Sequence, residues 1–259
     1  MLRTEGICYS IGKKTILKNI SLDFRPGDFN MILGPNGSGK STFLKVFSGE
    51  LKPTKGNVFM EEKKISDCKK EDIAKVRAVM TQQPELGFPL AVEEVVMMGR
   101  YPHFDFNPHK KDEEICLEAI AKMQVQHLVG RNYLTLSGGE KQRVQFARVL
   151  AQIWEVPPTG TRYLFLDEPL TNLDINYQQA FLMVASEMVK LNTVLIAIMH
   201  DINLSVQYAD NLIFLKQGEM IANGKPTEIL SEDLIRHVFD VDTRIIQNPL
   251  NGLPLMIYG

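Results

Sequence analysis

Eight residues near the start of the chain limit what it can fold into more than any other segment. The run from Gly34 to Ser41, GPNGSGKS, fits the pattern G-x-x-x-x-G-K-[ST]. An apolar stretch typical of a β-strand, FNMIL, precedes it, and an apolar helix is expected over 42–47. Glycines allow backbone N–H groups to close around phosphate oxygens, and a helix start adds partial positive charge. The sequence therefore predicts a phosphate-binding loop between a strand and a helix.

Two side chains complete this predicted loop. Lys40 brings a full positive charge to the β and γ phosphates of a nucleotide, and the Ser41 hydroxyl is a hard oxygen ligand for Mg²⁺. A glycine loop that acted only as a turn would not require a lysine and a serine at this offset. We therefore predict ATP and Mg²⁺ as the cofactors.

Polar residues follow two further apolar runs, 163–166 and 194–199. Ligands bind at the carboxyl ends of strands in open α/β sheets, and a buried unpaired carboxylate is costly. Asp167 is predicted to face Mg²⁺, usually through water, and Glu168 to orient or deprotonate the attacking water. His200 is predicted to contact the γ-phosphate. The alternatives are solvated acids in a strand-ending turn and a hydrogen-bonded surface histidine.

The order of patterns along the chain predicts an α/β fold of the P-loop NTPase type. Short β-type runs fill the first 33 residues and indicate an N-terminal antiparallel β subdomain, and 57–65 (NVFMEEKKI) is expected to be one strand. Near-continuous apolar strands between helices indicate a mostly parallel sheet core. We expect one domain, 1–259, with 1–83 and 156–259 as the catalytic core and about 84–155 as an inserted α-helical subdomain.

Composition narrows the classes of partner. The chain has 29 basic and 31 acidic residues and a net charge of -2, which gives no reason to expect nucleic acid as a partner. Its 3 cysteines lack the paired spacings of zinc sites and disulfide frameworks, so we expect them to be reduced. No apolar run reaches the roughly twenty residues that a membrane helix needs. We therefore predict a cytosolic chain that meets a membrane only through a partner.

The run Leu136 to Arg143, LSGGEKQR, resembles the signature of ABC ATPases. Ser137 and Glu140 also form the pattern of a capping box, which by itself would only start a helix. A capped helix start with Gly138 and Gly139 suits an anion. In the family this anion is the γ-phosphate held by the opposite subunit, so the resemblance implies a head-to-tail homodimer that encloses two ATP molecules.

The same resemblance extends over the whole chain. Tyr9 stands where the family stacks an aromatic ring on adenine, and the alternative is a core aromatic of an early strand. Gln82 matches the loop glutamine that senses Mg²⁺ and touches the permease, and Gln83 beside it is the alternative register. Asp174 ends the loop that contacts the other subunit and is also a plausible helix cap. The resemblance thus implies that the nucleotide is bound by Tyr9, Gly34, Pro35, Asn36, Gly37, Ser38, Gly39, Lys40, Ser41, Thr42, Ser137, Gly138, Gly139, Glu140 and Asp174. It implies Ser41, Gln82 and Asp167 for the metal, and Glu168, His200 and Gln82 for catalysis.

A long stretch between signature and acidic strand, 154–162, together with the runs 98–103 and 147–154, is similar to haem-importing members of the iron-siderophore, haem and vitamin B12 branch. That resemblance implies two copies of a separate permease and a periplasmic substrate-binding protein. The chain would lie at the cytoplasmic face of the inner membrane, attached through the permease. Lys141 and Leu170 depart from the usual family pattern, away from the phosphate chemistry.

Other functions remain open at this stage. A ferric siderophore or vitamin B12 is an alternative substrate, and a soluble ABC ATPase acting on DNA or ribosomes is an alternative class. Such clamps carry coiled coils, zinc modules or a second cassette, none of which this sequence contains. A protein that only binds nucleotide is opposed by Glu168. His103 and His109 could suggest a haem site, but in this branch substrate passes through the permease, so we do not expect the isolated chain to bind haem.

Overall fold

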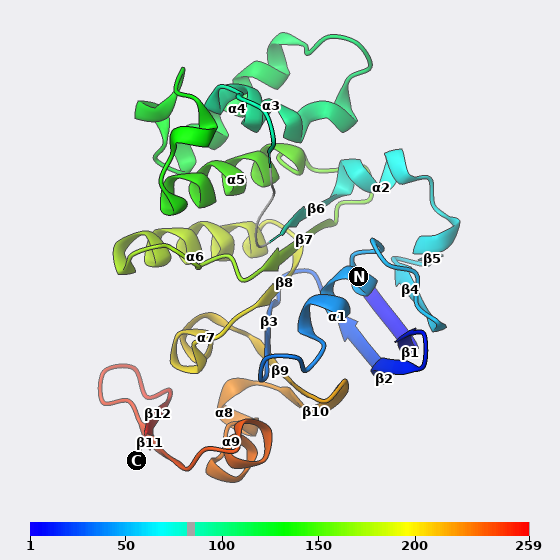
Figure 1. Cartoon of the computed structure of the whole chain (residues 1–259), viewed down its shortest axis with the longest axis vertical. Helices are drawn as coiled ribbons and strands as arrows, with labels where there is room; N and C mark the ends of the chain where they lie inside the picture. The colour runs from blue at the N-terminus through cyan, green and yellow to red at the C-terminus, as the bar shows by residue number, and fades with distance from the viewer. Residues whose placement is uncertain (82–85, 259) are drawn as a thin grey trace. The chain divides into compact units, whose positions relative to one another are not determined.

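The computed structural model describes residues 1–81 and 86–258 (Figure 1). They form two compact units. Unit 1 contains Met1–Cys68 and Val194–Gly259, and unit 2 contains Lys69–Thr193. Within the described residues, no helix combines the length and the apolar character that crossing a bilayer requires.

The N-terminal part of unit 1 is an antiparallel sheet of order β2-β1-β4-β5. Its strands are β1 (Leu2–Ile11), β2 (Lys14–Phe24), β4 (Lys55–Met60) and β5 (Lys63–Lys64). The single strand expected over 57–65 is therefore wrong. The chain turns at Glu61, whose φ of 52° is left-handed, and Phe59 then pairs with Lys64 in the returning strand.

Unit 1 also holds strands that run parallel, as predicted. β3 (Phe29–Leu33) pairs with β8 (Thr193–Ile198) on one side and β9 (Asn211–Lys216) on the other, both parallel. β10 (Glu219–Gly224) pairs antiparallel with β9 and forms a hairpin with it. All five residues of β3 are buried. Helix α1 (Lys40–Phe47) follows this strand and packs Phe47 edge-on against Phe24, with ring centroids 5.8 Å apart.

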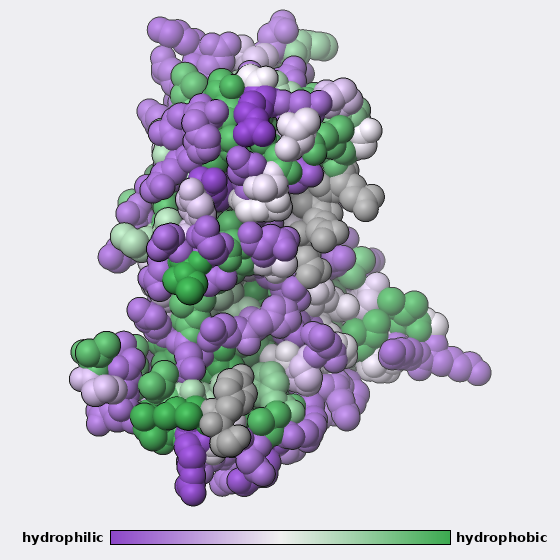
Figure 2. Space-filling view, turned by 60° about the vertical axis from the view of Figure 1, so that its left-hand side comes forward, coloured by the Kyte–Doolittle hydropathy of each residue, from purple (hydrophilic) through white to green (hydrophobic). Residues whose placement is uncertain are grey.

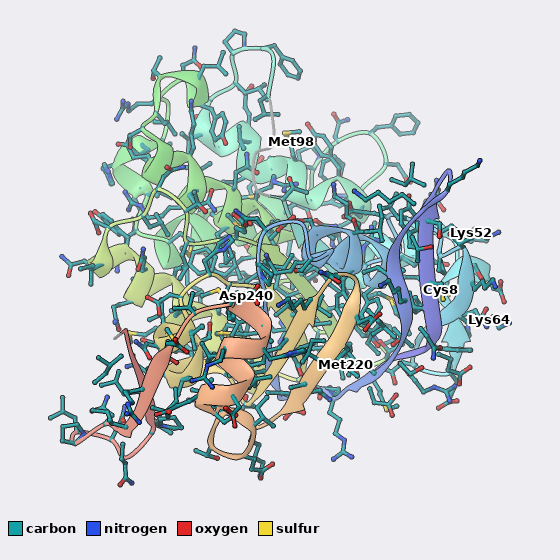
Figure 3. All side chains as sticks on the ribbon, turned by 60° about the horizontal axis from the view of Figure 1, so that its bottom comes forward. Cys8, Lys52, Lys64, Met98, Met220 and Asp240 are labelled. Atoms are coloured by element: carbon teal, nitrogen blue, oxygen red, sulfur yellow. The ribbon has the colours of Figure 1, made fainter. Side chains whose placement is uncertain are left out.

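The C-terminal tail of unit 1 forms two helices and a pair of antiparallel strands. It contains α8 (Pro226–Ile229), α9 (Glu232–Phe239), β11 (Thr243–Gln247) and β12 (Pro254–Tyr258). Asn203 in α7 (Ile202–Tyr208) exchanges two hydrogen bonds with the backbone of Met256, which fixes β12 on that helix. Asp240, labelled in Figure 3, lies at the end of α9. Its carboxylate pairs with the Lys216 ammonium at 2.9 Å.

Unit 2 combines a pair of parallel strands with a group of helices. Its elements are α2 (Lys70–Val76), β6 (Arg77–Met80), α3 (Val92–Met97), α4 (Lys110–Lys122), α5 (Gly138–Gln152), β7 (Arg162–Asp167) and α6 (Ile175–Lys190). β6 and β7 pair with Ala78 opposite Leu164. Helices α5 and α6 lie side by side (Figure 1), and Phe146 stacks on Phe181 with centroids 3.8 Å apart. Short 3-10 turns span Ile65–Asp67 (η1, in unit 1), Met98–His103 (η2), Gln126–Leu128 (η3) and Tyr133–Thr135 (η4).

The helical elements α3, α4 and α5 fall inside the segment 84–155 that was predicted to be helical, while the subdomain boundaries themselves stay a prediction. The long stretch 154–162 is anchored by Arg162. Its guanidinium donates to the carbonyls of Ile153 and Trp154 and, at 2.6 Å, to that of Leu191. This explains how an extended loop can lead into a buried strand.

The cysteines are unpaired and the surface drawn in Figure 2 is mostly hydrophilic. Cys8, Cys68 and Cys116 are free thiols, as expected, and Cys8 lies on β1 (Figure 3). The face drawn in Figure 2 carries hydrophilic side chains over most of its area, with hydrophobic ones in small groups.

Candidate active site

The loop between β3 and α1 has a backbone that only glycine permits at two positions. Gly34 has a φ of 153°, and a Cβ placed there would lie 2.2 Å from the Leu215 carbonyl oxygen. Gly39 has a φ of 102°, and its Cβ would meet the Ile16 carbonyl oxygen at 3.1 Å. Gly34 and Gly39 are therefore favoured by the close approach of other backbone segments, in addition to the room that a phosphate would need.

The centre of the loop is positively charged. Lys40 is only 6% exposed, and its ammonium donates to the carbonyls of Gly34 at 2.8 Å and Pro35 at 3.1 Å. The hydroxyl of Ser38 is buried and has no hydrogen-bond partner among the described residues. A buried polar atom without a partner is unfavourable, so this hydroxyl and the charge beside it suit a polar ligand such as phosphate. Asn36 and Gly37 are exposed at the tip, which leaves the loop accessible.

His200 lies at the same edge of the unit 1 sheet as this loop. β3 and β8 run parallel with Ile32 opposite Ile198, and the Met199 N–H donates to the Ile32 carbonyl at 3.0 Å. The residues after both strands therefore emerge together. His200 is exposed there, directly before α7, whose start is capped by Asp201 accepting from Leu204 N at 2.9 Å.

Tyr9 lies on β1, which pairs with the strand that approaches the phosphate loop. It is half-buried on β1 and pairs with Leu17 of β2. The Leu17 side chain lies 3.1 Å from where a Cβ on Gly39 would be. The strand that carries Tyr9 is thus the neighbour of the strand that packs against the phosphate loop, and the contact of Tyr9 with adenine stays a prediction.

In unit 2, the two predicted acids stand where β7 ends. Asp167 is 5% exposed and Glu168 is half-buried. Glu168 has a φ of 50°, in the left-handed region that non-glycine residues seldom adopt, and its carbonyl accepts from the Thr171 hydroxyl at 3.1 Å. Sparsely populated backbone of this kind is found often at functional sites.

The signature residues start α5 as a capping box, which confirms the sequence prediction. The Ser137 Oγ accepts from Glu140 N at 3.3 Å, and the Glu140 carboxylate accepts from Ser137 N at 2.8 Å. Two hydrogen bonds hold the pKa of the Glu140 carboxyl below its usual value. The larger effect comes from the Ser137 backbone N–H and the smaller one from the Ser137 hydroxyl. Glu140 is therefore an anion over the neutral pH range and supports the helix start.

The signature end borders a cavity of about 310 Å³ that it shares with the start of α6. Asp174 caps α6, as predicted, because its Oδ1 accepts from Tyr177 N at 3.1 Å. A Cβ on Gly138 would lie 3.1 Å from the Asn172 Cβ, and one on Gly139 would lie 2.9 Å from the Asn172 carbonyl oxygen. The signature glycines thus permit close packing of the loop that precedes Asp174.

Sequence reasoning did not single out Arg143 and Tyr177 as residues of this cavity. The Arg143 guanidinium carbon lies 3.8 Å from the centroid of the Tyr177 ring. No local pattern could reveal the contact, because the two residues belong to different helices. An arginine that ends the signature run was the only signal available.

Gln82 and Gln83 lie outside the described residues. Farther along, η2 is fastened within unit 2 by Arg100, which is 2% exposed and donates to Asp112 at 2.9 Å and Glu155 at 2.6 Å. His103 shares a hydrogen bond with the Gln152 carbonyl at 2.7 Å, and burial lowers the pKa of its imidazole.

The comparisons with known proteins point to one family. Residues 17–171 match the family model described as ABC transporter. The hemin import ATP-binding protein HmuV of Gloeobacter violaceus is 44% identical over 257 residues, which cover 99% of this chain and 94% of that protein. The HmuV of Pseudomonas aeruginosa is 40% identical over 99% of both chains.

Solved structures of ATP-binding cassettes share the fold. A metal-chelate type ABC transporter in an inward-facing conformation matches with a TM-score of 0.83 at 22% identity, covering 100% of this chain and 96% of that one. The dimeric cassette MJ0796, in a post-hydrolysis state with ADP and Pi, matches with a TM-score of 0.74 at 26% identity, covering 87% and 98%. These likenesses confirm the predicted fold class.

Proposed function

This chain belongs to the ABC transporter family of ATP-binding subunits, and from that premise we propose that it hydrolyses ATP to energise uptake of haemin through a separate membrane permease. The proposal of haemin as the substrate rests on the 44% identity between this chain and a hemin import ATP-binding protein, across 99% of the chain. In such a transporter, other chains select the substrate. The assignment of haemin therefore rests on sequence similarity, and the reaction proposed for this chain itself is ATP hydrolysis.

In unit 1, the loop around Lys40 would hold the triphosphate. The ammonium would move from the carbonyls of Gly34 and Pro35 to the β and γ phosphates, a stronger charge-assisted interaction. The helix start of α1 adds donors for the same oxygens. Tyr9 would stack on adenine, and His200, at the same sheet edge, would contact the γ-phosphate.

The residues also fit Mg²⁺. Ser41 offers a hydroxyl and Asp167 a carboxylate, both hard oxygen ligands, and Gln82 is proposed as a third contact. Mg²⁺ bound to nucleotide normally takes only one or two protein ligands together with phosphate oxygens and water. The ion would neutralise charge on the phosphates, while Glu168 positions the attacking water.

The signature end in unit 2 would act on the nucleotide of a second copy. We therefore propose a homodimer in which Ser137, Gly138 and Gly139 seal the ATP held by the partner's phosphate loop. Asp174 would lie in the loop that contacts the partner. A single copy would bind ATP but hydrolyse it slowly, because the transition state would lack these donors.

The dimer would work with two copies of the permease and, through it, with a periplasmic substrate-binding protein, at the cytoplasmic face of the inner membrane. The segment from Gln82 to about His109 is proposed to dock the permease. Tyr101 and Phe106 support this role, because the two residues are 58% and 96% exposed and aromatic side chains are enriched at interfaces. Substitution of both by serine should preserve basal ATPase activity but weaken its stimulation by the complex; unchanged coupling would contradict the docking role.

The function is tested by ATPase activity of the reconstituted permease complex with binding protein loaded with haem, a ferric siderophore or vitamin B12. Stimulation by haem alone is expected. Stimulation only by one of the other ligands would replace haem as substrate, and no stimulation by any would contradict an importer. Glu168→Gln should keep ATP binding and lose turnover, and unchanged turnover would refute its catalytic role.

A further inference from the structure

The C-terminal tail is bonded to α7, the helix that follows His200. The Asn203 side-chain amide on this helix donates to the Met256 carbonyl at 3.0 Å, and its oxygen accepts from the Met256 N–H at 2.8 Å. Asn203 thus takes the place of a neighbouring strand along the outer edge of β12. We call the pair Asn203 and Met256 the tail clamp. The helix and the hairpin, both in unit 1, can be followed in Figure 1.

The position of α7 depends on contacts of this kind. The helix has 7 residues, and isolated helices shorter than roughly 12 residues are marginal in water. Its start is tied to the residue after His200, because Asp201 Oδ1 accepts from Leu204 N at 2.9 Å. The buried Ser205 hydroxyl also donates to the Asp201 carbonyl, at 2.6 Å. A shift of α7 would therefore move the backbone directly beside His200.

The tail is anchored to the sheet independently of α7. The Lys216 ammonium of β9 donates to the His237 carbonyl at 2.6 Å, which fastens α9 to that strand. The Glu232 carboxylate of α9 accepts from the Ile245 N–H of β11 at 3.2 Å. Ile245 stands opposite Met256 in the hairpin. The hairpin is thus held at both of its strands, by α9 at β11 and by α7 at β12.

The clamp requires a side chain that both donates and accepts. Met256 is 5% exposed, so its N–H and its carbonyl each need a hydrogen-bond partner. The amide of Asn203 supplies a donor and an acceptor at the same time. A carboxylate would accept from the Met256 N–H but would turn a second oxygen toward the carbonyl, and an aliphatic side chain would satisfy neither group. The identity of residue 203 therefore decides whether the hairpin holds α7.

We propose that the C-terminal tail sets the position of His200, with Asn203 as the positioning residue that connects them. This inference rests on the proposed function, in which His200 contacts the γ-phosphate of the ATP held around Lys40. The tail clamp fixes α7, and the cap at Asp201 passes that constraint to His200. Because ADP lacks the γ-phosphate, loss of the clamp should affect hydrolysis and leave capture of the nucleotide by the Lys40 loop intact.

The first test records the NMR signal of the His200 ring in the full-length protein, assigned by comparison with His200→Ala. The two ligands are Mg²⁺ with adenylyl imidodiphosphate, a non-hydrolysable ATP analogue, and Mg-ADP. Asn203→Leu removes both bonds of the clamp and keeps the volume. The matched control is Asn251→Ala, which removes a bond inside the hairpin loop, where Asn251 Oδ1 accepts from Leu253 N at 3.0 Å. Thermal unfolding midpoints report the folding of each variant.

In the wild type and in Asn251→Ala, we expect a His200 signal that differs between the two nucleotides. In Asn203→Leu this difference should disappear. A signal that still distinguishes the nucleotides in Asn203→Leu would overturn the role of the tail clamp. Identical wild-type signals with both nucleotides would instead overturn the γ-phosphate contact of His200 in the proposed function, and the inference with it.

The second test measures kcat and KM for ATP in the reconstituted complex. Asn203→Leu should lower kcat about tenfold, as for misplacement of a catalytic group, and change KM less than about twofold. Asn251→Ala should match the wild type. An equal fall of kcat in both variants, or a raised KM with unchanged kcat, would show a merely structural tail and overturn the inference. Should Asn203→Leu not fold, Asn203→Asp, which keeps the shape and loses the donor, decides by the same measurements.

Discussion

The phosphate loop and the signature end both present a helix start, but they are built differently. At α1 the cap residue is Gly39, which has no side chain, and Lys40 adds a buried positive charge. At α5 the Ser137 hydroxyl already accepts from Glu140 N, and Glu140 adds a negative charge beside it. The first site is therefore suited to capture a triphosphate from solution. The second is suited to complete a site around a phosphate that another loop already holds.

The largest expected effect comes from the charge that only the first site possesses. Lys40→Ala should lower ATPase turnover about 1,000-fold, because it removes the cation that stabilises the transferring phosphoryl group, and it should also weaken ATP binding. Nucleotide titration and steady-state ATPase assays measure both. Arg143→Gln, which removes a cation near the signature end, serves as the comparison and should leave ATP binding to a single copy unchanged. Equal loss of binding in both variants would contradict the division of roles.

A second comparison uses the glycines. Gly34→Ala should destabilise the fold by about 3 kcal/mol, because the added Cβ would meet a backbone oxygen 2.2 Å away in left-handed backbone. Gly139→Ala should cost about 1 kcal/mol, since its contact with Asn172 is 2.9 Å and its backbone is helical. Urea unfolding of both variants gives the difference, and a larger cost at Gly139 would contradict the prediction.

Removal of the Ser137 helix cap should affect closure of the dimer more than binding of ATP to a single copy. Ser137→Ala should cost about 1 kcal/mol of stability as a lost N-cap and lower turnover about tenfold, while a single copy keeps its affinity for ATP. Calorimetry of unfolding and ATP titration separate the two effects. If the affinity of the isolated copy for ATP fell by the same factor as turnover, the signature end would contact the same ATP molecule as Lys40. That result would contradict the prediction.

The smallest expected effect is a pH dependence at Glu140. Its pKa lies below the ordinary value of 4.5 because Ser137 donates to the ionised carboxylate. The stability that this adds is therefore complete above pH 4.5 and disappears as pH falls through the lowered pKa. Glu140→Gln should cost about 0.5 kcal/mol at pH 7, and the difference should shrink as the solution is acidified. Urea unfolding over this range is the measurement; a difference that grew toward acid would contradict the sign.

The two regions also differ in how much the sequence could predict. The capping box followed from two residues three positions apart, Ser137 and Glu140, because a helix start imposes that spacing. The Asp174 cap followed from an aspartate placed directly before an expected helix. The strand over 57–65 was misassigned because Glu61 turns the chain by adopting left-handed backbone, a conformation that glutamate does not signal. The Arg143 and Tyr177 contact depends on how α5 packs against α6. Such packing joins residues far apart in the sequence, so no local pattern contains it.

The C-terminal tail also combines a local signal that the sequence contains with long-range contacts that it does not reveal. Ser231 caps α9 by accepting from Leu234 N at 3.2 Å, a signal that was present in the sequence. β11 and β12 were not predictable in this way, because their pairing and the Asn203 contact with Met256 are set by tertiary packing.

The central claim is tested most directly by light scattering of Glu168→Gln with Mg-ATP, in which hydrolysis is blocked. We predict that the 29.3 kDa chain doubles its mass with nucleotide, and that Ser137→Ala in the same background weakens the pair. A mass that stays at one chain under saturating Mg-ATP would contradict a triphosphate sealed between two copies.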